Sequence, residues 1–245
     1  MLNESVSLQY TKVFSFSILL NYKGCIFNKM ISLQNHMMIH EIFYSLQGEG
    51  VWVGLPNIFI RTMGCNLRCS YCDTQEAYEQ GSTMSIDEII DKVHQYHCDH
   101  ICITGGEPLL QKDLPLLLDH LQEESYQLSI ETNGSQYIQP LLKYSSLLIS
   151  LDIKCPSSQM HEHMDFSSIT LLRKTDQLKF IIKTKEDYNY AKEILNQYKP
   201  ECNCVMQPVW GMNPQTIAHW ILEDQLPIRF GVQLHKILWG EKKGV

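Results

Sequence analysis

Short apolar runs alternate with amphipathic segments along most of this 245-residue chain. The segment after Ser85 has the helical pattern, because Ser85 and Glu88 match a capping box and apolar residues across 86–93 recur at helical spacing. Strands that alternate with helices pair in parallel through right-handed crossovers. The sequence therefore predicts an α/β fold with a parallel sheet. The expected strands are 39–44, 57–61, 100–104, 127–131, 147–151, 178–183, 204–207 and 228–233, and further helical patterns cover 114–121, 188–198 and 214–222.

The length of the segment with a strand and helix pattern limits the kind of barrel that the chain can form. A closed (β/α)8 barrel usually takes about 250 residues, whereas the strand pattern here occupies only residues 38–245. We therefore expect an incomplete (β/α)6-type barrel of about six strands. Its active site should be built by the loops at the carboxyl ends of the strands.

Residues 1–37 differ from the rest of the chain. The apolar run at 13–20 resembles a weak signal-peptide core, but no A-x-A-like cleavage site follows it. Met37 and Met38 directly precede the first expected strand. We expect residues 1–37 to be a disordered leader, or upstream sequence translated ahead of the true start, and residues 38–245 to form one domain.

Composition and charge disfavour several classes of partner. The formal net charge is −7, from 20 basic and 27 acidic residues, which argues against direct binding to nucleic acid. No apolar run reaches the roughly 18 residues that a membrane-spanning helix needs. The nine cysteines are an odd number, and three of them form a tight cluster. They indicate free or metal-bound thiols in a reducing, cytoplasmic location.

Polar loops follow most of the expected strands. Because the carboxyl ends of parallel strands meet at one edge of a sheet, these loops should gather around one site. Such a gathering favours an enzyme, since polar residues without a common task would be scattered over the surface. The loops are 65–72, 104–108, 131–134, 152–154, 207–209 and 233–236.

The loop GCNLRCSYCDT carries the strongest chemical signal. Its cysteines, Cys65, Cys69 and Cys72, are spaced C-x3-C-x2-C. Three thiolates can hold three corners of a four-iron cluster and leave the fourth iron open for chemistry. The alternative is a zinc site with Cys98, Cys102 or a histidine as its fourth ligand, which would indicate a zinc-stabilised binding module without enzymatic activity.

The loop TGGEP at 104–108 is the second signal. Its two glycines let the backbone approach a ligand closely, and Pro108 fixes the exit of the loop, although a tight strand-to-helix turn has the same composition. TGGEP and the three-cysteine loop together resemble the radical S-adenosylmethionine (radical SAM) enzymes. The resemblance implies a 4Fe–4S cluster whose open iron binds the methionine moiety of S-adenosylmethionine. One electron from a low-potential donor, such as a flavodoxin-like protein, then yields a 5′-deoxyadenosyl radical.

A longer series of motifs narrows the resemblance. IFYSLQGEG at 42–50 precedes the cysteine loop, and ETNG, MQPV and QLHKILWG follow TGGEP in that order. Over residues 38–245 the chain resembles the 7-carboxy-7-deazaguanine synthase family. The resemblance implies conversion of 6-carboxy-5,6,7,8-tetrahydropterin to 7-carboxy-7-deazaguanine with loss of ammonia, a step toward queuosine, with Mg²⁺ and a homodimer. A glycyl-radical activase is the alternative enzyme, but it would not need SLQGEG or the threonine of CDT.

The resemblance also implies roles for individual residues. The Arg61 guanidinium is expected to meet the substrate carboxylate, the Gln47 amide to bind a pterin edge, and Thr74 to be a magnesium ligand. The expected substrate contacts are Leu46, Gln47, Gly48, Arg61, Thr104 and His235. The expected cofactor contacts are Tyr71, Asp73, Gly106, Glu107, Asp152, Ile153, Lys154, Gln207, Pro208, Val209 and Trp210, beside the cluster ligands Cys65, Cys69 and Cys72.

Structural interpretations compete with some of these roles. Arg61 also fits a surface ion pair at the end of a strand, and His235 also fits a hydrogen-bonded core histidine. Asp73 and Thr74 also fit a cap of the cysteine loop.

The chain departs from the family pattern at 152–154. Many relatives have Ser-Pro-Lys where this chain has Asp-Ile-Lys. Lys154 retains a cation for the cofactor, and Asp152 is expected to make a different hydrogen bond to the ribose. Some relatives use their C-terminal carboxylate on the substrate, but we assign no such role to Val245.

Overall fold

The computed structural model describes residues 35–245 of the chain. Most of the expected leader, residues 1–34, lies outside the described residues. The last leader residues are already part of the folded sheet, because β1 begins at His36 and the side chain of Met37 is fully buried in the core. Within the described residues, no helix has the length and apolar character needed to cross a membrane.

The described residues form a nine-stranded sheet in the order β3-β1-β2-β4-β5-β6-β7-β8-β9. β1 pairs with β2 in antiparallel fashion, and every neighbouring pair from β2 to β9 is parallel. The sheet does not close on itself, so the expected incomplete barrel is confirmed. The strands are β1 (His36–Leu46), β2 (Pro56–Thr62), β3 (Ser82–Ser85), β4 (His100–Gly105), β5 (Gln127–Thr132), β6 (Leu148–Ile153), β7 (Gln177–Ile182), β8 (Asn203–Pro208) and β9 (Arg229–Phe230).

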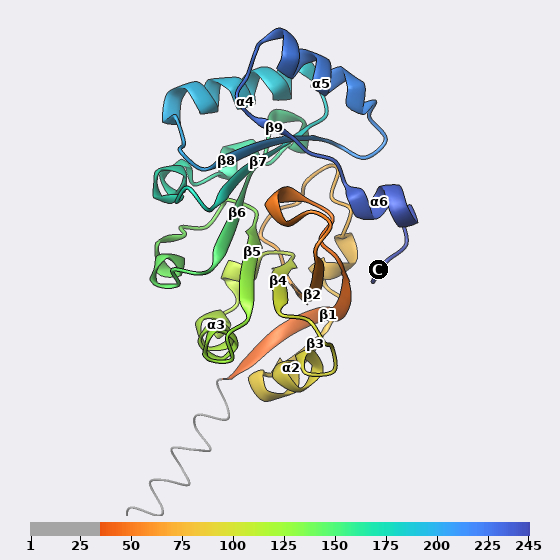
Figure 1. Cartoon of the computed structure of the whole chain (residues 1–245), viewed down its shortest axis with the longest axis vertical. Coiled ribbons are helices and arrows are strands. Elements are labelled where there is room, and N and C mark those ends of the chain that lie inside the picture. The colour runs from red at the N-terminus through yellow and green to blue at the C-terminus, as the bar shows by residue number, and fades with distance from the viewer. Residues whose placement is uncertain (1–34) are drawn as a thin grey trace, which may run out of the picture. The chain divides into compact units, whose positions relative to one another are not determined.

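Helices cover one face of the sheet. In Figure 1, α4 and α5 lie beside β7 to β9, while α2 and α3 lie beside β3 to β5. The α-helices are α2 (Ile86–Val93), α3 (Leu114–Glu123), α4 (Lys185–Tyr198), α5 (Pro214–Glu223) and α6 (Leu234–Trp239). The 3-10 helices are η1 (Gly50–Trp52), η2 (Gln75–Tyr78), η3 (Pro108–Leu110), η4 (Gln139–Lys143), η5 (Pro156–Ser158), η6 (His161–His163) and η7 (Phe166–Leu171).

The two faces of the parallel sheet differ in polarity. Along β6, the side chains of Ile149, Leu151 and Ile153 are fully buried in the apolar core beneath the helices. Ser150 and Asp152 alternate with them and therefore point to the other, inner face. The core thus lies between the sheet and its helices, and the inner face carries the polar side chains.

The predicted bounds of the last strand are wrong. The sequence pattern predicted a strand over 228–233, but β9 contains only Arg229 and Phe230. The chain then leaves the sheet. Leu234 donates its N–H to Gly48 O at 2.9 Å and is the first residue of α6, so it does not pair with β8. His235 therefore lies in a short helix and not at a strand end. The polar strand β3 was missed because its four residues show no apolar alternation.

Candidate active site

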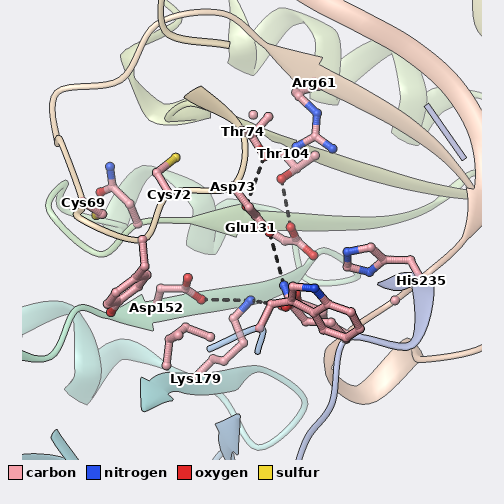
Figure 2. Close-up of a pocket in the computed structure, with 18 of the residues that line it drawn as sticks. Arg61, Cys69, Cys72, Asp73, Thr74, Thr104, Glu131, Asp152, Lys179 and His235 are labelled. Carbon is pink, nitrogen blue, oxygen red and sulfur yellow. Dashed lines mark hydrogen bonds and ion pairs between the residues drawn. The ribbon is translucent and has the colours of Figure 1, made fainter. Parts of the chain in front are cut away.

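A cavity of about 550 Å³ opens at the carboxyl ends of the parallel strands. Every polar loop singled out in the sequence contributes to its wall. Figure 2 shows Cys69 and Cys72 on one side of this pocket and His235 on the opposite side. The parallel register brings these loops together, since each leaves its strand at the same edge of the sheet.

The three-cysteine loop leaves β2 and lines the pocket with Cys65, Cys69 and Cys72. All three thiols are half-buried and close enough for their charges to interact. Burial raises the pKa of the Cys69 thiol, and the nearby Lys154 ammonium opposes that rise. A half-buried trio of thiols beside a cation fits an anionic iron–sulfur cluster, because such clusters are held by thiolates.

The TGGEP loop packs directly on the cysteine loop. A Cβ at Gly106 would collide with Gly64 O and would lie 3.0 Å from the Cys65 Cβ. The Glu107 N–H donates to the same Gly64 carbonyl oxygen at 2.8 Å. Glycine is therefore required at 106 for the two loops to touch.

Glu107 is placed differently from the expectation. Its carboxylate does not line the pocket but is fully buried, and it accepts hydrogen bonds from Asn133 N at 2.6 Å, Thr132 Oγ1 at 2.8 Å and Leu109 N at 3.0 Å. Burial raises the pKa of this carboxyl, although the three donors oppose the rise. The side chain of Ile153 is also absent from the pocket, because it points from β6 into the apolar core.

Gln47 and Thr104 converge on a carboxylate that the predicted set did not contain. The Gln47 amide donates to Glu131 Oε1 at 3.2 Å, and the Thr104 hydroxyl donates to Glu131 Oε2 at 2.8 Å. Figure 2 shows Glu131 at the centre of the pocket, below Thr104. Glu131 lies near the end of β5 and begins the ETNG segment, so its place in a predicted polar loop was the available signal.

Arg61 points into the pocket beside an aromatic wall. Its Nε donates to Glu41 Oε1 at 2.8 Å, and its guanidinium carbon lies 5.7 Å from the ring centre of Phe43. Phe43 stacks on Phe59 at 4.9 Å between ring centres. The expected site position and the alternative ion pair are thus both present, since Arg61 lines the cavity while Glu41 holds one edge of its guanidinium.

Two buried lysines and two carboxylates form a charged cluster on the opposite wall. Lys179 lies 2.7 Å from Glu49 Oε2 and 3.3 Å from Asp152 Oδ1, and Lys154 lies 2.8 Å from Asp152 Oδ2. Burial alone would raise the pKa of Glu49, but the Lys179 ammonium lowers that pKa to about 2. Lys179 was missed by sequence reasoning, although a lysine inside the otherwise apolar strand segment LKFII was a usable signal.

The C-terminal segment is attached to the end of the cysteine loop. Lys236 lies 2.6 Å from Asp73 Oδ2, and Gln233 donates to the same oxygen at 3.3 Å. Thr74 lines the pocket beside them, and its hydroxyl donates to Asp73 Oδ1 at 3.2 Å. Thr74 is the residue before η2, but its side chain makes no capping hydrogen bond there. Val245 also lines the pocket.

Gly48 and His235 pack against each other in the pocket wall. A Cβ at Gly48 would collide with His235 Nδ1. Burial lowers the pKa of His235, and the carboxylates of Glu49 and Asp73 oppose this effect. Leu46 lines the same wall. The SLQGEG segment and α6 therefore fit closely only because residue 48 has no side chain.

The remaining expected cofactor contacts also line the pocket. Gln207, Pro208, Val209 and Trp210 line it together with Tyr71. Among the described residues, neither end of the Gln207 amide nor the Tyr71 hydroxyl has a hydrogen-bond partner, although both are buried. Buried polar groups normally have partners, so these atoms fit the polar groups of a bound ligand such as S-adenosylmethionine.

Among the described residues, the two cysteines expected as a fourth zinc ligand, Cys98 and Cys102, lie away from the cysteine loop. Cys102 lies on β4 below the pocket, where its thiol accepts a hydrogen bond from Gln47 Nε2 at 3.4 Å. Cys98 lies before β4 and donates to Pro56 O, the first residue of β2, at 3.3 Å. The cysteine loop follows the other end of β2, so neither thiol lies beside it.

Comparison with known proteins agrees with this geometry. Residues 59–216 match the family model described as the Radical SAM superfamily. The fold and the three-cysteine loop therefore define a radical SAM protein. The 7-carboxy-7-deazaguanine synthase of Methanospirillum hungatei is 42% identical over 82% of this chain and 85% of its own length. That of Thermoplasma acidophilum is 35% identical over 85% of this chain and 100% of its own length. The chain belongs to the 7-carboxy-7-deazaguanine synthase family.

A solved structure has the same fold. The crystal structure of QueE from Escherichia coli superposes with a TM-score of 0.66 at 24% identity, over 82% of this chain and 95% of that one. This likeness concerns the fold alone, whereas the curated relatives and the family model support the expected synthase over a glycyl-radical activase or a zinc-stabilised module.

Proposed function

We propose that this chain converts 6-carboxy-5,6,7,8-tetrahydropterin to 7-carboxy-7-deazaguanine with loss of ammonia, as its family membership implies. The observation that carries the proposal is the meeting of three groups in one pocket: the thiols of the cysteine loop, the Arg61 guanidinium and the Gln47–Thr104–Glu131 hydrogen-bonded group. The first group suits a cluster, the second a carboxylate, and the third the polar edge of a heterocycle.

Cys65, Cys69 and Cys72 would hold a 4Fe–4S cluster, and Gly106 with the 207–210 segment would border S-adenosylmethionine. When bound, this pair supplies a 5′-deoxyadenosyl radical by one-electron cleavage of the sulfonium. The protein has to position the reacting carbon and keep water away from it. The loops that surround the pocket on several sides support both tasks.

Arg61 would bind the substrate carboxylate with the edge of its guanidinium that Glu41 leaves free. Glu131 has two neutral donors, Gln47 and Thr104, on its oxygens, and these three side chains would bind the N–H and C=O groups of the pterin. Phe43 offers a flat apolar wall against which a ring can stack. These contacts would hold the carboxylate-bearing carbon toward the cysteine loop.

Thr74 would contribute its hydroxyl to Mg²⁺, with waters and substrate oxygens as the other ligands. The adjacent Asp73 carboxylate accepts a hydrogen bond from the Thr74 hydroxyl and pairs with Lys236. Asp73 therefore orients the hydroxyl oxygen that the ion would use.

Asp152 would take the place of the serine that many relatives have. Its carboxylate lies between the Lys154 and Lys179 ammonium groups. A carboxylate has about four lone-pair positions, so these two cations leave capacity to accept hydrogen bonds from ribose hydroxyls. Substituting Asp152→Asn should weaken S-adenosylmethionine binding, and unchanged affinity in isothermal calorimetry would contradict this role.

The proposal also covers the catalytic domain, the cellular location, the oligomeric state and the electron donor. We expect residues 38–245 to act as the catalytic domain, in the cytoplasm and as a homodimer, and to receive electrons from a flavodoxin-like donor. Light scattering checks the dimer, and a single-subunit mass would contradict it. Turnover that requires dithionite and is not supported by reduced flavodoxin would contradict the donor.

The central experiment is anaerobic incubation of the reconstituted protein with S-adenosylmethionine, reductant and the carboxypterin. We expect 7-carboxy-7-deazaguanine as the product. Cys69→Ala should abolish cofactor cleavage, because a methyl group cannot replace a thiolate ligand. Cys204→Ala, on β8 and outside the pocket, is the matched control and should retain activity. Protein that binds zinc but neither iron nor sulfide would exclude the proposed function.

A further inference from the structure

Asn133 lies between the TGGEP loop and the cysteine loop. It follows β5, and its backbone N–H donates to the buried carboxylate of Glu107 at 2.6 Å. Asn133 is only 7% exposed and lines the pocket. Glu107 therefore fixes the backbone from which the Asn133 amide reaches toward the cysteines.

The hydrogen bonds of Asn133 define which way its amide faces. The side-chain oxygen Oδ1 accepts a hydrogen bond from Ser135 N at 2.9 Å. The amide nitrogen Nδ2 consequently faces the other side, where it lies 3.1 Å from Asn66 Oδ1 and 3.6 Å from Cys65 Sγ. A flipped amide would place an oxygen against both the Asn66 oxygen and the sulfur, so the donor must be the group beside Sγ.

We propose that Asn133 is a positioning residue that raises the reduction potential of the cluster by donating a hydrogen bond to Cys65 Sγ. The backbone N–H of Leu67 donates to the same sulfur at 3.4 Å. Reduction adds negative charge that spreads onto the thiolate ligands, and N–H groups aimed at a ligand sulfur stabilise the reduced state more than the oxidised one.

The proposed hydrogen bond links three loops. TGGEP supplies Glu107, ETNG supplies Asn133, and the cysteine loop supplies Cys65. The carboxylate of Glu107 thus acts on the cluster through Asn133 and not by entering the pocket. This inference rests on the proposed function, because it concerns a cluster held by Cys65.

The test measures the midpoint potential of the reconstituted cluster by redox titration followed by electron paramagnetic resonance, without S-adenosylmethionine or pterin. Asn133→Ala removes the donor, and we expect a shift to a more negative potential. Asn133→Asp keeps the size and the acceptor for Ser135 N but replaces the donor by a carboxylate oxygen. We expect an even more negative potential for this variant, because it places negative charge beside Sγ.

Asn66→Ala is the matched control. It removes the neighbouring acceptor of the same amide but leaves the donor to Sγ, so the potential should be unchanged or slightly raised. Iron and sulfide contents, and circular dichroism, are measured on every variant. If an Asn133 variant is folded but incompletely loaded, the titration reports on its loaded fraction, and that potential is judged by the same criteria.

Three results would overturn the inference: unchanged potentials in both fully loaded Asn133 variants, a shift of equal size in Asn66→Ala, or unfolding of both Asn133 variants. Unfolding of both variants would mean that the Asn133 amide serves only to fold the loop. Wild-type protein that takes up no cluster is a different outcome, because it contradicts the proposed function together with everything that rests on it. The potentials separate these cases without any measurement of turnover.

Discussion

Lys179 on β7 donates a hydrogen bond to Glu49 Oε2 at 2.7 Å, although 130 positions separate the two residues in the chain. The side chain of Lys179 is 6% exposed and that of Glu49 is 16% exposed. Asp152 lies on the other side of the same ammonium group. One buried lysine therefore joins the SLQGEG segment after β1 to the end of β6.

Replacing Lys179 should destabilise the protein strongly. Lys179→Met keeps most of the apolar side-chain volume but leaves Glu49 and Asp152 as like charges without their shared cation. Loss of one partner from a buried ion pair typically costs about 3–5 kcal/mol in the free energy of unfolding. Urea denaturation measures this, with Lys174→Met as the control, since Lys174 pairs with Glu201 on the surface at 81% and 75% exposure. Equal losses in the two variants would contradict the prediction.

The contribution of Glu49 should depend on pH in a defined window. The pKa of Glu49 is lowered from 4.5 to about 2, so the folded state binds its proton less tightly than the unfolded chain. The stabilisation is then fully present above about pH 4.5 and disappears as the pH falls toward 2. We expect the difference in unfolding free energy between wild type and Glu49→Gln to shrink over this range. A difference that stays constant from pH 6 to pH 3 would show that Glu49 does not act through its charge.

Gly48→Ala should impair substrate binding through His235. The added methyl group would collide with His235 Nδ1 and displace the ring from the pocket wall. We expect weaker binding of the carboxypterin with little change for S-adenosylmethionine, measured by calorimetry on the anaerobic protein. In a His235→Ala background the same glycine substitution should have a much smaller effect, because the collision is absent. Equal effects in both backgrounds would remove His235 from the explanation.

Arg61→Ala should weaken carboxypterin binding by about 2–5 kcal/mol if the guanidinium pairs with the substrate carboxylate in a dry site. Arg61→Lys should recover only part of this affinity, since an ammonium group cannot offer a two-pronged donor. Arg229→Ala, on the exposed strand β9, is the control and should bind normally. Unchanged affinity in Arg61→Ala would leave only the structural pair with Glu41.

Local sequence patterns predicted the strand cores and one helix start well. The capping box at Ser85 is confirmed, with Glu88 N donating to Ser85 Oγ at 3.2 Å and Ser85 N donating to Glu88 Oε2 at 2.7 Å. The start of α4 was placed too late, at 188, although Thr184 and Asp187 form a second capping box. Capping depends on residues three apart in the sequence, so it can be read without knowledge of the fold.

Partners that are distant in the sequence were not predictable in this way. A lysine in β7, a glutamate after the first strand and an asparagine after β5 each look like isolated polar residues. Their roles follow from which strands are neighbours and from the register of those strands, as with Asp152 opposite Lys179. Glu107 shows the opposite error. Its motif predicted a cofactor contact, but its carboxylate is buried because Thr132 and Asn133 of the next segment donate hydrogen bonds to it.

The sequence by itself determined the alternation of strands and helices, the gathering of polar loops at one sheet edge and the three-thiol loop. These features depend on side-chain periods and spacings within short segments. Only the tertiary structure decided that 234–239 is a helix, that Lys179 pairs with Glu49 and Asp152, and that the Glu107 carboxylate turns away from the pocket. Each of these outcomes is set by hydrogen bonds and charges between segments far apart in the chain, which no local pattern encodes.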